Sequence, residues 1–400
     1  MSADGVILCL NSGSSSRKFA LYRFGEGTEE LLAEGAAERI DLESGRLWIR
    51  DGQKNTLSDA QRNFSGPEHA LRVLFEEIDR LRLPPPSAIG HRLVHGGPDH
   101  SAPERVTPQL MRALRRLIPF APLHLPAEIQ AIETAASRFP ALPQVACFDT
   151  AFHRQMPELA QRFPLPGAFW DDGVRRYGFH GISYEYIMQS LGRRAPSRII
   201  IAHLGNGASM AAVRDGRPVD TTMGFTPTGG FMMGTRTGDL DPGVVVYLVN
   251  QKNYDGRRIE QLVNHQSGLL GVSGISSDMK ILLDQRPTEP RAALAVEMFC
   301  YQLRKHIGAL AAVLDGLDLL VFTGGIGERA APVRREVCGG LAHLGILLDE
   351  QKNDADTDVI SSPHSASMVR VIPTNEDLMI ARHTHKLVLS AGKGRISCQS

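Results

Sequence analysis

The sequence contains little cysteine. Only five occur among its 400 residues, at positions 9, 147, 300, 338 and 398, and none belongs to a C-x-x-C pair. An odd, scattered set of this kind is typical of reduced thiols buried in a cytosolic protein. Disulfide bonds and a zinc site are the alternatives, and neither is favoured by the spacing.

Net charge and long apolar runs are also missing. Lys plus Arg and Asp plus Glu both number 44, which argues against a broad basic surface for nucleic acid or anionic membranes. No run approaches the roughly 20 apolar residues that span a bilayer. The first residues, MSADGVILCLNSG, contain no basic segment ahead of the short apolar stretch, so we expect no secretory signal. These absences predict a cytoplasmic protein that binds neither nucleic acid nor membrane.

Two common nucleotide motifs are absent as well. The chain has no G-x-x-x-x-G-K-[ST] segment and no protein-kinase catalytic loop. A phosphate site in this chain therefore has to be built in another way.

Short β-rich apolar runs alternate with segments of helical periodicity. The expected strands cover residues 6–10, 18–22, 198–203, 209–213, 319–323 and 369–373. Residues 67–81 and 293–314 have the apolar spacing of helices, with Ser65 as the expected cap of the first. This alternation indicates an α/β protein, and 400 residues suggest two domains.

One pattern occurs twice. An apolar strand leads into LNSGSSS and a second strand near the start, and RIIIAHLGNGAS followed by MAAVRDG repeats that shape near residue 200. Two ordinary β-hairpins would explain the pattern, but hairpin turns rarely contain three hydroxyls. We therefore interpret the repeat as a duplicated domain pair that grips a ligand between its halves.

The small-residue turns suit an anion. Backbone N–H groups, serine hydroxyls and Lys18 after the first turn are typical ligands of phosphate. A third glycine cluster, VFTGGIGER at 321–329, follows an apolar strand. Together the three clusters indicate two phosphate turns and a nucleotide shelf.

Eleven segments carry a resemblance to a known family. They are NSGSSSRKF, GHRLVHGG, APLH, FDTAFH, RRYGFHG, HLGNGAS, MGFTP, MMGTRTGDLDPG, SGLLGVSGISSDM, FTGGIGE and IPTNEDLMIAR. They run in family order over essentially the whole chain, which resembles the acetate kinase family within the superfamily of acetate and sugar kinases, Hsp70 and actin.

The resemblance implies a fold and an activity. The fold is α/β, with duplicated ribonuclease H-like (actin-like ATPase) domains that form a two-domain clamp around a cleft. We expect the first domain at residues 1–149 plus 377–400 and the nucleotide-binding second domain at 150–376. The implied reaction is reversible, Mg²⁺- or Mn²⁺-dependent phosphoryl transfer from ATP to acetate by a homodimer.

Four side chains are the catalytic candidates. A transfer between two anions needs positive groups, and the planar forks of Arg92 and Arg236 suit carboxylate and phosphate. By resemblance Arg92 holds the acid, while Arg236 and His180 stabilise the phosphoryl group in transit. By resemblance Asp149, which follows an apolar strand, is either linked to the metal or positions the carboxylate. The alternatives are a surface ion pair for an arginine, a core histidine at 180 and a turn cap at 149.

The remaining site residues follow from the resemblance. Asn11 and Glu376 correspond to metal contacts, and the acyl pocket is implied at Val94, Leu123, Phe179 and Pro227. Such a pocket discriminates weakly, because one methylene is worth only about 1–3 kcal/mol. The implied nucleotide contacts are Ser14, Ser16, Lys18, His203, Leu204, Gly205, Asn206, Gly207, Asp278, Met279, Lys280, Gly324, Gly325, Ile326, Gly327 and Glu328.

Several positions depart from the family pattern: Leu125, Ile182, Tyr184, Gly229, Lys280 and Arg329. None is an expected catalytic residue, but they surround the acid and adenosine positions. A related short-chain acid kinase, acting on propionate or butyrate, or a pyrophosphate-using variant is therefore the alternative function. A nucleotide-binding module without turnover is a third reading, and the intact candidate residues argue against it.

Overall fold

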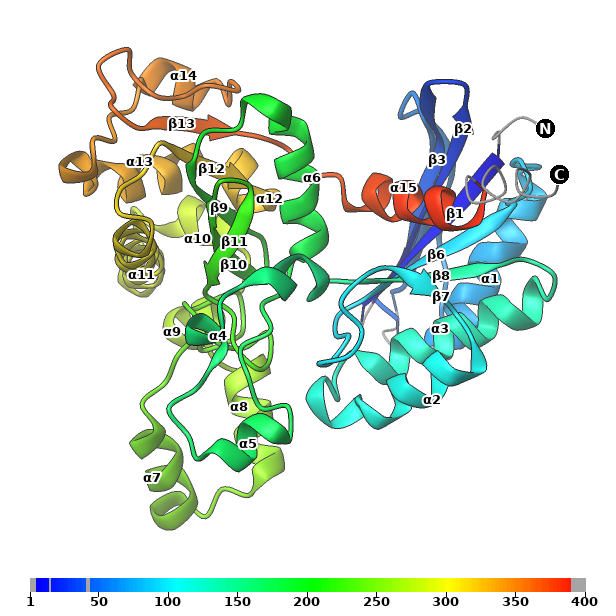
Figure 1. The fold of residues 1–400 in the computed structure, drawn as a ribbon, viewed down its shortest axis with the longest axis horizontal. Coiled ribbons are helices and arrows are strands. Elements are labelled where there is room, and N and C mark those ends of the chain that lie inside the picture. The colour runs from blue at the N-terminus through cyan, green and yellow to red at the C-terminus, as the bar shows by residue number, and fades with distance from the viewer. Residues whose placement is uncertain (1–4, 14–15, 41–43, 390–400) are drawn as a thin grey trace, which may run out of the picture. The chain divides into compact units, whose positions relative to one another are not determined.

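The computed structural model describes the chain except for residues 1–4, 14–15, 41–43 and 390–400. Contacts divide the chain into two compact units. Unit 1 comprises Met1–Ala151 and Asn375–Ser400, and unit 2 comprises Phe152–Thr374. Each unit is built on one sheet with helices on both faces (Figure 1).

Unit 1 contains an eight-stranded sheet in the order β5-β4-β3-β2-β1-β6-β8-β7. Strands β1 to β5 form an antiparallel meander, and β1, β6 and β8 run parallel to one another. The bounds are β1 (Gly5–Ser12), β2 (Ser16–Gly25), β3 (Thr28–Glu38), β4 (Arg46–Asp51), β5 (Thr56–Gln61), β6 (Ala88–Leu93), β7 (Glu104–Arg105) and β8 (Gln144–Phe148).

Helices cover both faces of this sheet. Helices α1 (Pro67–Arg80) and α3 (Leu125–Arg138) pack on the face that presents Leu8, Leu10 and Ile89. On the other face lies α15 (Glu376–Val388), drawn in red in Figure 1, whose Ile380 and Thr384 lie directly over Gly90. A shorter helix, α2 (Pro108–Arg116), packs beside α3. Because Gly90 has no side chain, α15 can pack close to the sheet at this position.

Unit 2 repeats the central part of this topology. Its sheet has the order β11-β10-β9-β12-β13, with an antiparallel meander of β9, β10 and β11 followed by parallel β12 and β13. The bounds are β9 (Arg198–Leu204), β10 (Ala208–Arg214), β11 (Arg217–Thr221), β12 (Leu319–Thr323) and β13 (Met368–Val371). In unit 1 the corresponding order is β3-β2-β1-β6-β8, so the expected duplication is confirmed at the level of strand order.

The helices of unit 2 also occupy both faces. Helix α6 (Gly181–Leu191) packs on the residues Ile199, Ile201 and Val321, and the long α11 (Pro290–Val313) packs on the opposite face. Further helices are α4 (Glu158–Gln161), α5 (Gly167–Asp171), α7 (Pro242–Lys252), α8 (Gly256–His265), α9 (Gly268–Ser273), α10 (Met279–Gln285), α12 (Gly324–Arg329), α13 (Ala331–Gly339) and α14 (Glu350–Asp354).

The six expected strands and two expected helices are present, with bounds shifted by a few residues. The expected cap at Ser65 is wrong. The N-cap of α1 is Gly66, which makes no side-chain cap, and the backbone N–H of Ser65 instead donates to His69 Nδ1. Cys9, Cys147, Cys300 and Cys338 are free and buried, and Cys398 lies outside the described residues.

Candidate functional site

In unit 1 the predicted residues gather around Arg92, which lies on β6. Its guanidinium makes a forked contact with Asp149: Nε donates to Oδ1 at 3.0 Å and Nη2 donates to Oδ2 at 2.7 Å. Nη1 donates to Asn11 Oδ1 at 3.3 Å and lies 3.8 Å from Glu376 Oε2. Four residues that are far apart in the sequence therefore form one cluster.

Strand ends explain why these side chains meet. Asn11 is near the end of β1, Asp149 directly follows β8, and Glu376 begins α15. Because β1, β6 and β8 are parallel neighbours, their carboxyl ends lie at one edge of the sheet, where α/β proteins present ligands. The Asp149 carboxylate is only 2% exposed, whereas 20% of the Arg92 side chain is exposed. Burial opposes the charge on Arg92, but Asp149 and Glu376 raise its pKa above the ordinary value.

Two further carboxyl groups in this region were not predicted. Glu128 on α3 is buried, and its carboxylate accepts the backbone N–H of Val94 at 3.1 Å. Burial raises the pKa of Glu128 to about 8, against the lowering effect of that hydrogen bond and of Arg92. Burial, together with the charge of Glu376, raises the pKa of Asp377 to about 6. Nothing in the sequence distinguishes these acids from exposed ones, because their burial depends on how the helices pack.

The serine-rich turn is described only in part. Ser14 lies outside the described residues, while Ser16 and Lys18 lie on β2, where Lys18 pairs with Asn11 across the hairpin. Arg17 is buried and donates to the carbonyl groups of Gly13 and Ser16, so it closes the turn from within. The sequence reasoning missed this role, because an arginine beside a lysine suggests a solvated charge.

In unit 2 a second cluster surrounds Gly207, in the turn between β9 and β10. Arg236 Nη1 lies 3.2 Å, and His180 Nε2 3.6 Å, from the position that a Cβ on Gly207 would occupy. Arg236 Nη1 also donates to the carbonyl of Pro227 at 3.1 Å. The Asn206 carbonyl accepts the N–H of Gly234 at 3.0 Å, which fastens the turn to the segment that carries Arg236. A guanidinium nitrogen and an imidazole nitrogen thus converge on a glycine turn, a position where groups that can donate hydrogen bonds could meet an oxyanion.

Two stacked histidines complete this cluster. The rings of His180 and His203 lie 4.2 Å apart with an interplanar angle of 19°. Ser209 Oγ lies 2.8 Å from His180 Nδ1, and Ser183 Oγ lies 2.9 Å from His203 Nδ1. Neither serine was predicted as a site residue. Ser209 ends the HLGNGAS segment and could have been found from that motif, whereas Ser183 had no signal of its own.

The third glycine cluster forms the short helix α12, directly after β12. The Glu328 carboxylate accepts the N–H groups of Gly324 at 3.0 Å and Thr374 at 3.2 Å. The buried guanidinium of Arg334 donates to the Gly327 carbonyl at 2.9 Å, an interaction that the sequence did not predict. Gly324, Gly325, Ile326, Gly327 and Glu328 are therefore held as one rigid turn.

The other predicted contacts are more scattered. In unit 2 Asp278 caps α10 by accepting the Lys280 N–H at 2.8 Å, Met279 is buried and Lys280 is exposed. Of the expected acyl pocket, Val94 and Phe179 are buried, and Leu123 and Pro227 are half-buried. Leu204 is buried and Gly205 donates its N–H to Gly207 O at 3.1 Å.

Two of the departures are accommodated by packing. Leu125 is fully buried in the core with Leu93 and Ile129, and Ile182 is 2% exposed. Of the other departures, Arg329 is the last residue of α12. Gly229 directly precedes Gly230, whose backbone N–H donates to the Asp239 carboxylate.

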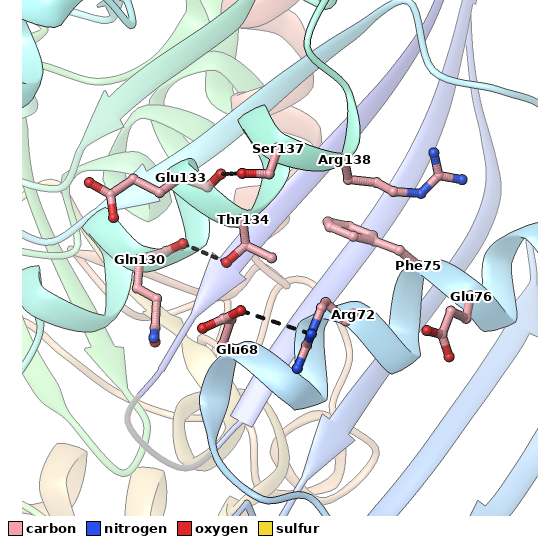
Figure 2. Close-up of a pocket in the computed structure, with 9 residues that line it drawn as sticks. All are labelled: Glu68, Arg72, Phe75, Glu76, Gln130, Glu133, Thr134, Ser137 and Arg138. Carbon is pink, nitrogen blue, oxygen red and sulfur yellow. Dashed lines mark hydrogen bonds and ion pairs between the residues drawn. The ribbon is translucent and has the colours of Figure 1, made fainter.

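A hollow between α1 and α3 lies apart from the predicted residues of unit 1. Figure 2 shows its lining, which includes Glu68, Arg72, Glu133 and Arg138, with an ion pair between Glu68 and Arg72. None of the predicted site residues lines this hollow.

The part of the chain that the structure describes contains no helix with the length and apolar character of a membrane span.

Comparison with known proteins assigns the family. Residues 6–382 match the model of the acetokinase family. The chain belongs to this family. It is 47% identical over 402 residues to an acetate kinase of Rhodopseudomonas palustris, covering 96% of this chain and 98% of the relative. A Methylocella silvestris acetate kinase is 46% identical over 397 residues, with the same coverage of both chains.

Solved structures agree with this assignment. The Porphyromonas gingivalis acetate kinase has a TM-score of 0.85 at 38% identity, covering 96% of this chain and all of that one. A Francisella tularensis propionate kinase has a TM-score of 0.90 at 36% identity with the same coverage. With these neighbours and the two α/β sheets, the duplicated actin-like ATPase fold expected from the sequence is confirmed.

Proposed function

We propose that this protein is an acetate kinase that transfers a phosphoryl group reversibly between ATP and acetate. One structural observation supports the proposal: Arg236 Nη1 and His180 Nε2 both lie beside the Gly207 turn. The relatives support the proposed reaction, because curated acetate kinases are 40–47% identical to this chain over nearly its whole length.

The reaction is a direct displacement. An acetate oxygen forms a bond to the γ-phosphorus while the bond from that phosphorus to the bridging oxygen breaks, and the electron pair leaves with ADP. No proton has to be transferred, so the protein has to position two anions and compensate their charge.

Unit 1 supplies the groups for the acid. Arg92 is held by Asp149 through a forked contact and keeps a partly exposed side chain, which can bind the acetate carboxylate. Val94 and Leu123 would contact the methyl group. The buried Glu128 side chain accepts the backbone N–H of Val94 and so holds this part of the backbone in place.

Unit 2 supplies the groups for the phosphates. Arg236 and His180 donate hydrogen bonds to the phosphoryl oxygens as charge develops on them. The turn 203–207 and the rigid turn 324–328 offer backbone N–H groups and close approach to the nucleotide.

We propose that Asn11 and Glu376 would hold a divalent metal in unit 1, because amide and carboxylate oxygens are the ligands that Mg²⁺ prefers. Their oxygens lie close together, since Asn11 Oδ1 accepts from Arg92 Nη1 and Glu376 Oε2 lies 3.8 Å from the same nitrogen. Within the described residues, no three His, Cys, Asp or Glu side chains gather into a metal site of protein ligands alone. When bound, the metal would neutralise charge on the nucleotide phosphates.

Acetyl phosphate formation tests the proposal. The purified chain is incubated with ATP, Mg²⁺ and each straight-chain acid from two to four carbons, and acyl phosphate is trapped with hydroxylamine. We expect product with acetate, and a smaller kcat/KM with propionate. The absence of product with every acid would reject the proposal. A preference for propionate would favour the second candidate, which the similarity to the propionate kinase structure supports.

We also propose that the protein is a cytoplasmic homodimer. Helix α7 buries none of its own side chains, and Val244, Val246, Tyr247 and Val249 are each at least 40% exposed. An apolar helix of this kind is a suitable surface for a second copy. Light scattering after gel filtration should give twice the 43.7 kDa mass of one chain for the wild type. The Tyr247→Glu variant should have the mass of a single chain. A wild-type mass of one chain would contradict this proposal.

A further inference from the structure

A buried chain of hydroxyl groups ends on His180. Ser209 Oγ lies 2.8 Å from His180 Nδ1, and the Tyr184 hydroxyl is hydrogen-bonded to the same Ser209 Oγ. Tyr184 and Ser209 are both 0% exposed, and His180 is 9% exposed. Tyr184 is one of the departures from the family pattern, and the function proposed above assigns it no role.

Local backbone geometry explains how the three side chains meet. His180 is the N-cap of α6, with φ 58° and ψ 22°, a left-handed conformation that is costly for a residue with a Cβ. Tyr184 begins the hydrogen-bonded part of that helix, because its N–H donates to the His180 carbonyl at 3.1 Å. One helical turn therefore brings the two side chains to the same side. Ser209 lies on β10, directly opposite His203 on β9.

The chemistry of the hydroxyls sets the direction of these hydrogen bonds. A phenol is more acidic than an aliphatic alcohol and is therefore the better donor. With Tyr184 as the donor to Ser209 Oγ, the hydrogen of Ser209 is left for His180 Nδ1. A neutral imidazole that accepts at one nitrogen carries its proton on the other. In this arrangement the proton of His180 would be on Nε2, the nitrogen that lies beside the Gly207 turn and Arg236.

We propose that Tyr184 is a positioning residue that acts through Ser209 to keep the proton of His180 on Nε2. This inference deepens the proposed function, since it names what makes His180 a hydrogen-bond donor to the phosphoryl group. In the other tautomer Nε2 would present a lone pair to an anion, which is repulsive. Tyr184 itself touches neither substrate.

The neighbouring residue fixes the second ring. Ser183 Oγ lies 2.9 Å from His203 Nδ1, and His203 stacks on His180 at 4.2 Å. Consecutive residues of one buried helix turn thus hold both rings of the stack. The stack and these two hydrogen bonds together orient the His180 ring.

The test combines kinetics with a direct reading of the tautomer. Tyr184→Phe removes the hydroxyl and keeps the ring, and Tyr186→Phe on the same helix is the matched control. Steady-state kinetics give kcat and KM for ATP and acetate. Nitrogen-15 spectra of histidine-labelled protein at pH 8 separate protonated from unprotonated ring nitrogens, and the signals of His180 are identified by their loss in His180→Gln.

We expect a wild-type His180 with a protonated Nε2 and an unprotonated Nδ1. In Tyr184→Phe both tautomers should be populated, with kcat about tenfold lower and both KM values within twofold, as for the loss of one hydrogen bond. Tyr186→Phe should match the wild type in every measurement.

Three results would overturn the proposal. The first is a wild-type His180 protonated on Nδ1. The second is a Tyr184→Phe variant with unchanged nitrogen shifts, whatever happens to kcat, since the hydroxyl would then act only through packing. The third is an unchanged kcat despite a mixed tautomer. The wild-type spectrum tests the hydrogen-bond direction even if the variant does not fold. It also gives its answer if no acyl phosphate forms, which separates this inference from the proposed reaction.

Discussion

Replacing Glu128 by Gln should remove a pH dependence of stability that originates in unit 1. The Glu128 carboxyl is 3% exposed, and burial raises its pKa from 4.5 to about 8. The folded state therefore holds a proton that the unfolded state releases at a much lower pH. The stabilisation is fully present below pH 4.5 and is lost as the pH rises through about 8.

The size of the effect follows from the shift. Each pH unit between the two pKa values changes the free energy of unfolding by about 1.4 kcal/mol. Relative to Glu128→Gln, the wild type should lose about 2 kcal/mol between pH 6 and pH 8, slightly less than two full units of slope because the folded-state carboxyl is half ionised at pH 8. The Gln side chain keeps an oxygen for the Val94 N–H, so the two proteins should differ mainly in this slope. Asp377, whose pKa is also raised, is present in both and cancels in the difference.

The two tryptophans make the measurement specific to unit 1. Trp48 lies on β4 of unit 1 and Trp170 on α5 of unit 2, and these are the only two in the chain. With Trp170→Phe in both backgrounds, denaturant unfolding followed by tryptophan fluorescence reports on Trp48 alone. Glu133→Gln, on the same helix but half exposed and paired with Arg115, is the control and should keep the wild-type slope, because Glu128 is still present. Parallel stability profiles of wild type and Glu128→Gln from pH 6 to pH 8 would refute the reasoning.

Three further predictions concern unit 2. Arg236→Ala should lower kcat by about 10³-fold with a smaller change in KM, because its guanidinium acts on the phosphoryl group in transit; near-normal turnover would contradict that role. Gly207→Ala places a Cβ 3.2 Å from Arg236 Nη1 and should lower kcat without lowering the melting temperature, whereas Gly256→Ala, with open space around it, should change neither. Glu328→Ala should raise KM for ATP about tenfold through the loss of two backbone contacts, while Glu328→Gln, which keeps the accepting oxygen, should stay within twofold of the wild type.

The sequence predicts the inner strands well, because their signal is strong. β1, β9 and β12 contain apolar runs that are buried on both faces, and a glycine directly follows each strand. The outer strands of unit 1 carry no such signal. β5, with the sequence TLSDAQ, has no buried residue, so no apolar periodicity could reveal it. Its formation depends on pairing with β4, which supplies backbone partners independently of side-chain type.

The candidate site shows a similar division. The residues at positions 92, 149 and 236 could be chosen from the sequence, because the two arginines stand in glycine-rich segments and Asp149 follows an apolar strand. The pairing of Arg92 with Asp149 across 57 residues could not be derived, since it depends on the register of β6 and β8. The hydrogen bonds that link Tyr184 to His180 through Ser209 could not be predicted either, because a tyrosine in an apolar helix usually indicates core packing.

The repeated strand order explains where the site residues lie, but not which residues they are. In unit 1, Asn11 and Arg92 stand near the ends of β1 and β6, and in unit 2, His203 and Gly324 stand at the ends of the corresponding strands β9 and β12. The same topology thus brings the same strand ends together twice. One unit occupies them with carboxylates and an amide around an arginine, and the other with glycine turns and stacked imidazoles. The first set suits the metal and the acid of the proposed reaction, and the second suits its polyphosphate oxygens. The duplicated fold therefore fixes position, and divergence within the repeat supplies the chemistry.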